Sequence, residues 1–156
     1  MFEATVRSSS AFLLLAVALL GCAQAPVQLA SPPAIEAVVP AIASHFSACS
    51  LDMLMTAYAP SIEFVSPSTP KPIVGLQAVR EHFAGACTLS FRPAMKVEAQ
   101  RVRMLSSESA VVTGTYTFGR SDRPNDKPWP AFFVITVQGV EGRWLVTTQA
   151  SIPVPQ

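Results

Sequence analysis

The sequence AVVTGTYTF at residues 110–118 predicts a β-strand with two different faces. Its threonines share one face, and its larger apolar side chains share the other, because neighbouring strand residues point in opposite directions. Two similar segments follow, AFFVITV at 131–137 and WLVTTQASI at 144–152. The first is apolar on both faces, so we expect that strand to be covered on both sides. The dipeptide Glu141-Gly142 between them predicts a hairpin turn.

The segment from Arg92 to Met104 predicts a further strand with a shift in its pattern. Val97 and Ala99 alternate with polar residues, and the apolar positions then change parity to Val102 and Met104. A one-residue change of parity is typical of a β-bulge, which bends a sheet. The polar residues 119–130 predict a long loop after the strand at 110–118.

Helical patterns precede these strands. Residues 35–49 place an apolar residue on one face at each turn, with Pro40 on the other face as a kink or as the true helix start. Residues 51–58 predict a second helix, 62–65 a strand, and 75–86 a third helix. Helices followed by antiparallel strands predict an α+β fold in which a curved sheet wraps around three N-terminal helices.

The N-terminus has the pattern of an export signal. Residues 1–10 are polar, and residues 11–20 (AFLLLAVALL) are wholly apolar but too short to span a membrane as a helix. The following Leu19-Leu20-Gly21-Cys22 resembles a bacterial lipobox, which predicts a signal peptide at 1–21 and a lipid on Cys22. The alternative is an ordinary cleavage site with an incidental cysteine. Ala23 after the cysteine, rather than aspartate, favours the outer membrane.

Residues 22–33 then predict a flexible tether, and residues 34–156 a single folded domain. The expected location is the bacterial cell envelope, at the periplasmic face of the outer membrane. Contact with the membrane is expected only through the lipid anchor.

The composition excludes several classes of protein. Of 156 residues, 50% are hydrophobic and 13% charged, which excludes a disordered chain. The net charge of +1 argues against nucleic-acid binding. Cys49 and Cys87 are the two cysteines left once Cys22 is lipidated, and an oxidising compartment makes them a disulfide candidate; the alternative is two buried free thiols. No spacing of His and Cys predicts a metal site, and no cofactor motif is present.

Six segments resemble the nuclear-transport-factor-2-like, or SnoaL-like, superfamily, whose fold is a cone. They are, in chain order, 46–52 (FSACSLD), 58–67 (YAPSIEFVSP), 75–83 (GLQAVREHF), 130–133 (PAFF), 142–146 (GRWLV) and 149–155 (QASIPVP). The last three look most like the branch related to the association domain of calcium/calmodulin-dependent kinase II.

The resemblance also implies a pocket inside the cone. Strand parity and the resemblance together assign Tyr116, Phe132, Gln149 and Ser151 to it. That branch lines its cavity with an arginine and a histidine pair, where this chain has Phe132, Gln149 and Ala150. We therefore expect a more apolar pocket that is poorly suited to acid–base chemistry.

No residue is assigned a catalytic role. The strands expected to line the cone carry no acid, Glu63 and Glu98 are expected to face water, and both histidines are expected to be partly exposed. The sequence therefore favours non-catalytic binding of a small apolar molecule, or protein interaction at the envelope. The alternative is a cofactor-independent isomerase, cyclase or dehydratase that uses the cone pocket. The resemblance implies a homodimer formed through the outer face of the sheet, where the threonines of 113–117 lie with Arg101 and Arg103.

Overall fold

A computed structural model describes residues 32–155. The predicted signal peptide, Cys22 and most of the predicted tether lie outside the described residues. The elements in chain order are α1 (Pro32–Glu36), α2 (Val38–Ser47), α3 (Leu51–Met55), β1 (Tyr58–Val65), β2 (Ile73–Val74), α4 (Leu76–Cys87), β3 (Pro93–Met104), β4 (Ser109–Arg120), β5 (Trp129–Val140) and β6 (Arg143–Pro153). This confirms the predicted α+β fold, with β2 as an additional short strand.

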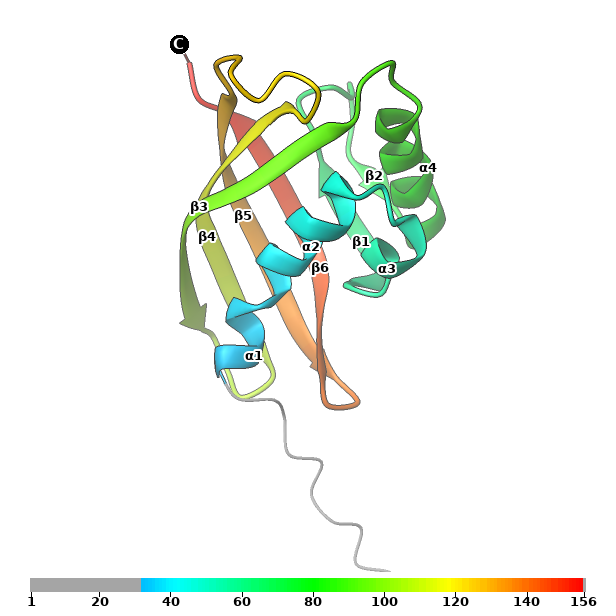
Figure 1. The fold of residues 1–156 in the computed structure, drawn as a ribbon. Helices are drawn as coiled ribbons and strands as arrows, with labels where there is room; N and C mark the ends of the chain where they lie inside the picture. Colours follow the sequence, from blue (N-terminus) through cyan, green and yellow to red (C-terminus); the bar gives the residue numbers. More distant parts are fainter. Residues whose placement is uncertain (1–31, 156) are drawn as a thin grey trace, which may run out of the picture.

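The strands form one mixed sheet. Its order is β2-β1-β6-β5-β4-β3, in which β1 pairs with β6 in parallel and the other neighbours are antiparallel. In Figure 1 the long strands β3 to β6 curve, and α1 and α2 lie across one face of them. The helix α4 lies beside β1 and β2 at the other end of the sheet. One face of the sheet is therefore covered by helices.

The core lies between α2 and this inner face. The predicted helix stripe is confirmed, because its larger apolar members are buried: Ile35, Val39, Ile42 and Phe46. A break at Ala37 divides the predicted helix in two, and Pro40 lies in the first turn of α2, where a proline costs no backbone hydrogen bond. The helix α1 begins at Pro32, so the end of the predicted tether at 22–33 is already helical.

The strand pairing confirms the predicted β-bulge. The register of β3 against β4 shifts between Val97 and Ala99, just before the apolar pattern changes parity to Val102 and Met104. The strand β1 begins at Tyr58, earlier than predicted, and contains Pro60. The pairing of β1 with β6 is irregular between Tyr58 and Glu63, which allows a strand to contain a proline there.

One expectation for the sheet is wrong. The strand β5 is covered on one face only: Phe133 and Ile135 are buried, whereas Phe132 is 49% exposed and Val134 is 40% exposed. An apolar pattern on both faces therefore does not mark a strand buried on both sides in this chain. The outer face of β5 is apolar and open in the single chain.

Candidate ligand-binding cavity

A cavity of about 160 Å³ lies between the inner face of the sheet and the helices α2 and α4. Each wall comes from a different element. The lining residues are Ile42 and Phe46 on α2, Phe64 at the end of β1, Ser66, Pro67 and Ser68 in the loop after it, His82, Phe83 and Ala86 on α4, Met95 on β3, Tyr116 and Phe118 on β4, and Gln149 and Ser151 on β6. The curvature of the sheet brings β4 and β6 to the same space as the ends of α2 and α4.

The walls of the cavity are aromatic. The Phe83 ring lies 5.4 Å from that of Phe46 and 5.3 Å from that of Phe64, measured between ring centroids. On the sheet side, the Phe118 ring lies 4.9 Å from that of Tyr116. Contacts of this length, tilted or edge-to-face, are favourable for aromatic pairs and hold the rings in place. The cavity is therefore bounded by a connected group of rings.

A polar group of side chains lies at the sheet side of this cavity, which we call the floor. Gln149 is only 3% exposed, and its Oε1 accepts a hydrogen bond of 2.9 Å from the Tyr58 hydroxyl. Gln149 and Ser151 also lie within hydrogen-bonding reach of the Tyr116 hydroxyl. Tyr58 and Tyr116 are themselves buried. Buried polar groups are normally satisfied in this way, and such a network fixes side-chain positions.

Both tyrosines of the floor remain protonated at neutral pH. Burial raises the pKa of Tyr58 well above its ordinary value, and the neighbouring Tyr116 raises it further. Burial also raises the pKa of Tyr116, and hydrogen bonds from Ser151 and Gln149 offset part of that rise. Each phenol therefore acts as a neutral group with one O–H to donate.

His82 is a cavity residue that the sequence analysis did not identify. Its ring is partly exposed, as predicted, and lies 5.3 Å from that of Phe64. Partial burial lowers its pKa, so the neutral imidazole is favoured at neutral pH. The available signal was its position beside Phe83 and one turn after Val79, which placed it at the edge of the apolar stripe of the helix.

The predicted pocket residues divide into two groups. Tyr116, Gln149 and Ser151 lie on the inner face and line the cavity. The prediction for Phe132 is wrong, because this side chain points to the outer face between Thr115 and Ile152, and its neighbour Phe133 faces inward. In a strand that is apolar on both faces, alternation does not say which face is inner.

The cavity carries no charged partner among the described residues. None of the residues that line it is Asp, Glu, Lys or Arg. Glu63 and Glu98 are exposed, as predicted, and Glu98 pairs with Lys96 at 3.1 Å. Asp52, at the start of α3, forms an ion pair of 2.8 Å with Arg80 on α4. In the part of the chain described, no three His, Cys, Asp or Glu side chains are grouped as metal ligands would be.

A disulfide joins the two helices that wall the cavity. Cys49, just after α2, is bonded to Cys87, the last residue of α4. Phe46 and Ala86 line the cavity three residues and one residue before these cysteines. The bond thus ties the ends of both walls together. Within residues 32–155, no helix is long and apolar enough to cross a membrane.

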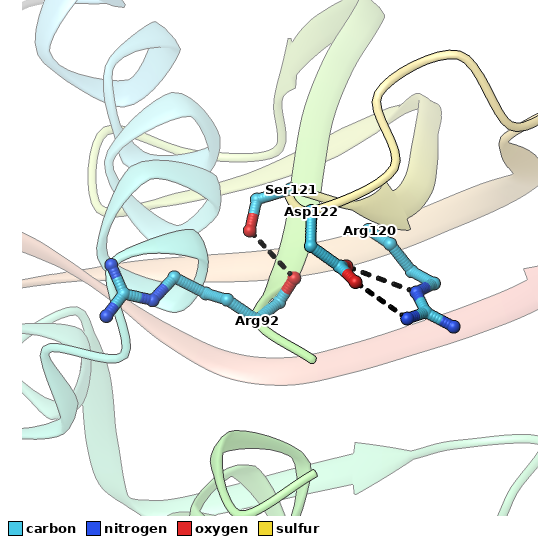
Figure 2. Close-up of polar contacts among 4 residues, drawn as sticks. All are labelled: Arg92, Arg120, Ser121 and Asp122. Atoms are coloured by element: carbon cyan, nitrogen blue, oxygen red, sulfur yellow. Dashed lines mark hydrogen bonds and ion pairs between the residues drawn. The ribbon is translucent and has the colours of Figure 1, made fainter. Parts of the chain in front are cut away.

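A second hollow, of about 250 Å³, lies under the loop after β4. Its best-buried cation, Arg120, is engaged by Asp122 through two hydrogen bonds of 2.7 and 3.2 Å, and its guanidinium lies 4.4 Å from the Phe91 ring. Figure 2 shows this pair, the hydrogen bond of 3.2 Å from the Ser121 hydroxyl to the Arg92 carbonyl, and the Arg92 side chain pointing away from Asp122. Arg120 lowers the pKa of Asp122. These contacts hold the loop and pair Arg120 with Asp122 rather than with a ligand.

Comparisons with known proteins agree with this architecture. The SnoaL-like domain family matches residues 39–146, which is more than half of the chain. No curated protein matches the sequence significantly.

Solved structures show the same fold at low identity. One, from Xanthomonas campestris, is named for the calcium/calmodulin-dependent protein kinase II association domain; it is 20% identical, with a TM-score of 0.67 over 83% of this chain and 95% of that one. A ketosteroid isomerase-like protein from Erwinia carotovora atroseptica is 16% identical, with a TM-score of 0.64 over 80% and 96%. A cystatin-like protein of unknown function from Nostoc punctiforme is 12% identical, with a TM-score of 0.70 over 83% and 96%. The chain therefore belongs to the SnoaL-like domain family and has its nuclear-transport-factor-2-like fold.

Proposed function

We propose that this protein is an exported lipoprotein that binds a small, largely apolar molecule in its cone cavity, without catalysing a reaction. The observation that carries the proposal is the composition of the cavity: aromatic walls, a hydrogen-bonded polar floor and no carboxylate among its described lining. Ligand pockets combine mostly apolar walls with a few fixed polar groups in this way. Chemistry that moves protons needs a group with a suitable pKa beside the ligand, and carboxylates are the usual choice in such pockets.

The test is native mass spectrometry of a soluble fragment that starts at Ala23, purified from the periplasm. We expect extra mass on the wild-type fragment and its loss in Ala86→Phe, which fills the cavity from α4. Ala84→Phe is the matched control, because Ala84 lies on the same helix outside the cavity lining. A ligand retained in the Ala86 variant would contradict the proposal.

The export and anchoring part of the proposal rests on the sequence of residues 1–22. We expect the full-length protein to fractionate with the outer membrane and to carry a diacylglycerol thioether on Cys22. Cys22→Ala should release the protein from the membrane and remove the lipid mass. An unchanged mass and unchanged membrane attachment in that variant would rule out lipidation.

The outer face of the sheet supports a homodimer as part of this proposal. Its exposed apolar residues lie side by side across neighbouring strands, because Phe132 pairs with Ile152, and Val134 pairs with Ala150. Ala150 pairs in turn with Val65 on β1. A second copy of the chain would bury this surface. Contiguous exposed apolar patches commonly mark such protein–protein contacts.

One observation favours an enzyme as the second candidate. His82 lines the cavity, and its lowered pKa keeps a neutral imidazole available as a base. Isomerase-like and dehydratase-named proteins are among the solved structures of this fold. If the retained ligand is converted to a product, and His82→Gln stops that conversion without preventing binding, the enzyme reading replaces the binding one.

A further inference from the structure

We propose that the cavity selects a neutral, ring-sized molecule by an oxygen atom that accepts hydrogen bonds at the floor, and that Tyr58 is the positioning residue that imposes this choice. The inference rests on the small-molecule binding proposed above. It assigns the chemical class of the ligand and gives a role to Tyr58, which lies behind Gln149 and does not line the cavity.

The Tyr58 hydroxyl fixes the orientation of the Gln149 amide. Tyr58 is 2% exposed, and Gln149 is its one hydrogen-bond partner among the described residues, at 2.9 Å from Oε1. If the amide were turned over, the buried phenol hydrogen would have no acceptor, and an unmet buried donor costs about 1–3 kcal/mol. Tyr58 therefore holds the carbonyl end of Gln149 and leaves its NH₂ end on the other side.

The floor of the cavity offers hydrogen-bond donors to a ligand. The Gln149 NH₂ group has two N–H donors, and the hydroxyls of Tyr116 and Ser151 have one each. One Gln149 N–H and the Ser151 O–H are used by the Tyr116 oxygen, which leaves the second Gln149 N–H and the Tyr116 O–H for a ligand. The Gln149 carbonyl oxygen is already used by Tyr58. The floor thus presents two free donors, one on β4 and one on β6, so an oxygen that accepts from both, such as a carbonyl, complements it.

The lining and the volume of the cavity limit the charge and the size of its ligand. The described lining has no Asp, Glu, Lys or Arg, and burial lowers the pKa of His82, which keeps that ring neutral. A charged ligand would lose its hydration without gaining a partner of opposite charge. The cavity volume of about 160 Å³ is close to the ~150 Å³ cavity in another protein that binds benzene, so one ring fits between these walls.

The test uses cyclohexanone and methylenecyclohexane, which have nearly the same shape and differ in the exocyclic oxygen. Calorimetric titration of the fragment from Ala23 should give about tenfold tighter binding of the ketone, the equivalent of one net hydrogen bond. In a ¹⁵N spectrum, the side-chain NH₂ signal of Gln149 should move with the ketone only. The exposed amide of Gln77 on α4 is the internal reference.

Variants separate positioning from folding. Tyr58→Phe should lower the ketone preference from about tenfold to about twofold, with unchanged affinity for methylenecyclohexane. If that variant does not fold, Gln149→Met removes the Gln149 donor directly and should lower the preference at least as far. Thr136→Val is the matched control, because it removes a hydroxyl that bonds Thr147 elsewhere in the sheet.

The outcomes are distinct. Equal affinity for the two probes, or a full ketone preference in a folded Tyr58→Phe, would overturn this inference and leave small-molecule binding in place. If Tyr58→Phe does not fold, a full preference in Gln149→Met would do the same. Failure of both probes to bind would overturn the inference, and a fragment that also carries no retained mass in native mass spectrometry would overturn the proposed function.

Discussion

Gly114 shows how little room a single position in this sheet has. It lies on the inner face of β4, beside Gln100 of β3 and Phe133 of β5. A Cβ atom at this position would collide with the Ala99 carbonyl oxygen and lie 2.6 Å from the Phe133 ring. The β-bulge in β3 brings Ala99 close, so a residue without a side chain is required there.

We expect Gly114→Ala to lower the free energy of unfolding by about 1–3 kcal/mol, because backbone and ring must both shift to admit the methyl group. Gly85→Ala is the matched control. Gly85 lies in α4 with nothing within 4 Å of the added methyl, so this change should stabilise by about 0.5–1 kcal/mol. Urea denaturation of both variants measures the difference. A neutral effect of Gly114→Ala would contradict the close contact of β3 and β4.

His82 makes the stability of the fold depend on pH. Its folded-state pKa lies below its ordinary value of about 6.5, so the unfolded chain binds this proton more readily. The contribution of His82 is therefore absent above about pH 7 and becomes destabilising as the pH falls below about 6.5. We expect urea midpoints that decrease between pH 7.5 and pH 5, and a smaller decrease in His82→Gln. An equal decrease in both proteins would show that His82 is not involved.

Residue by residue, the sequence identified positions where a polar and an apolar face differ. In β4 the threonines alternate with Val112 and Tyr116, so Tyr116 was assigned to the inner face correctly. In β5 both faces are apolar, and Phe132 was assigned to the wrong one. His82 was missed because the shape of the cavity depends on how α4 packs on β1, which periodicity alone does not contain.

At the scale of elements, the end of α2 is shaped by its disulfide. The backbone N–H of Ser50 donates to the His45 carbonyl and that of Cys49 to the Phe46 carbonyl, the hydrogen bonds of a Schellman helix end. Cys49 has a φ of 53°, a left-handed conformation that usually requires glycine. A cysteine is kept at this strained position, and its sulfur is bonded to the end of α4.

We expect the double variant Cys49→Ala, Cys87→Ala to lose about 3–4 kcal/mol of stability, as the sequence separation of 38 predicts from chain entropy. Cys49→Gly with Cys87→Ala should regain about 1 kcal/mol, because glycine accepts the left-handed conformation. Urea denaturation of the three proteins measures both steps. Full labelling of both thiols in the denatured, non-reduced wild-type protein would contradict the bond itself.

Elements with one clear period were predicted well. The helices, and the bulge in β3, were predicted from the spacing of apolar residues, because each helix and the strand β3 has one apolar and one polar face. The extension of β1 back to Tyr58 was not predicted, because residues 58–60 include a proline and follow a helical pattern. Their strand conformation comes from pairing with β6, a partner distant in sequence.

At the scale of the whole molecule, the outer sheet face combines an apolar centre with opposite charges on either side of it. Phe132 and Val134 lie on the central strand β5, Arg101 is exposed on β3, and Glu63 is exposed on β1. Two sheets that pack face to face around a two-fold axis along the strands would place Arg101 opposite the partner's Glu63. Charge complementarity then adds to apolar burial.

We expect Phe132→Asp to weaken the homodimer by at least about tenfold, because a carboxylate would be buried at the centre of the interface. Val74→Asp is the matched control, since Val74 is also exposed but lies on β2 at the edge of the sheet. Sedimentation equilibrium of the fragment from Ala23 gives both dissociation constants. A monomeric wild type, or an equal effect of the two changes, would contradict this interface.

If the cone cavity holds a small neutral molecule, that molecule should be visible directly in the purified protein. The most direct measurement is a crystal structure of the fragment from Ala23, purified from the periplasm without added ligands. We expect electron density for a ring-sized molecule among Phe46, Phe83 and Tyr116, with an oxygen atom facing the Gln149 amide nitrogen. A cavity filled by ordered water, or closed by the surrounding side chains, would contradict it.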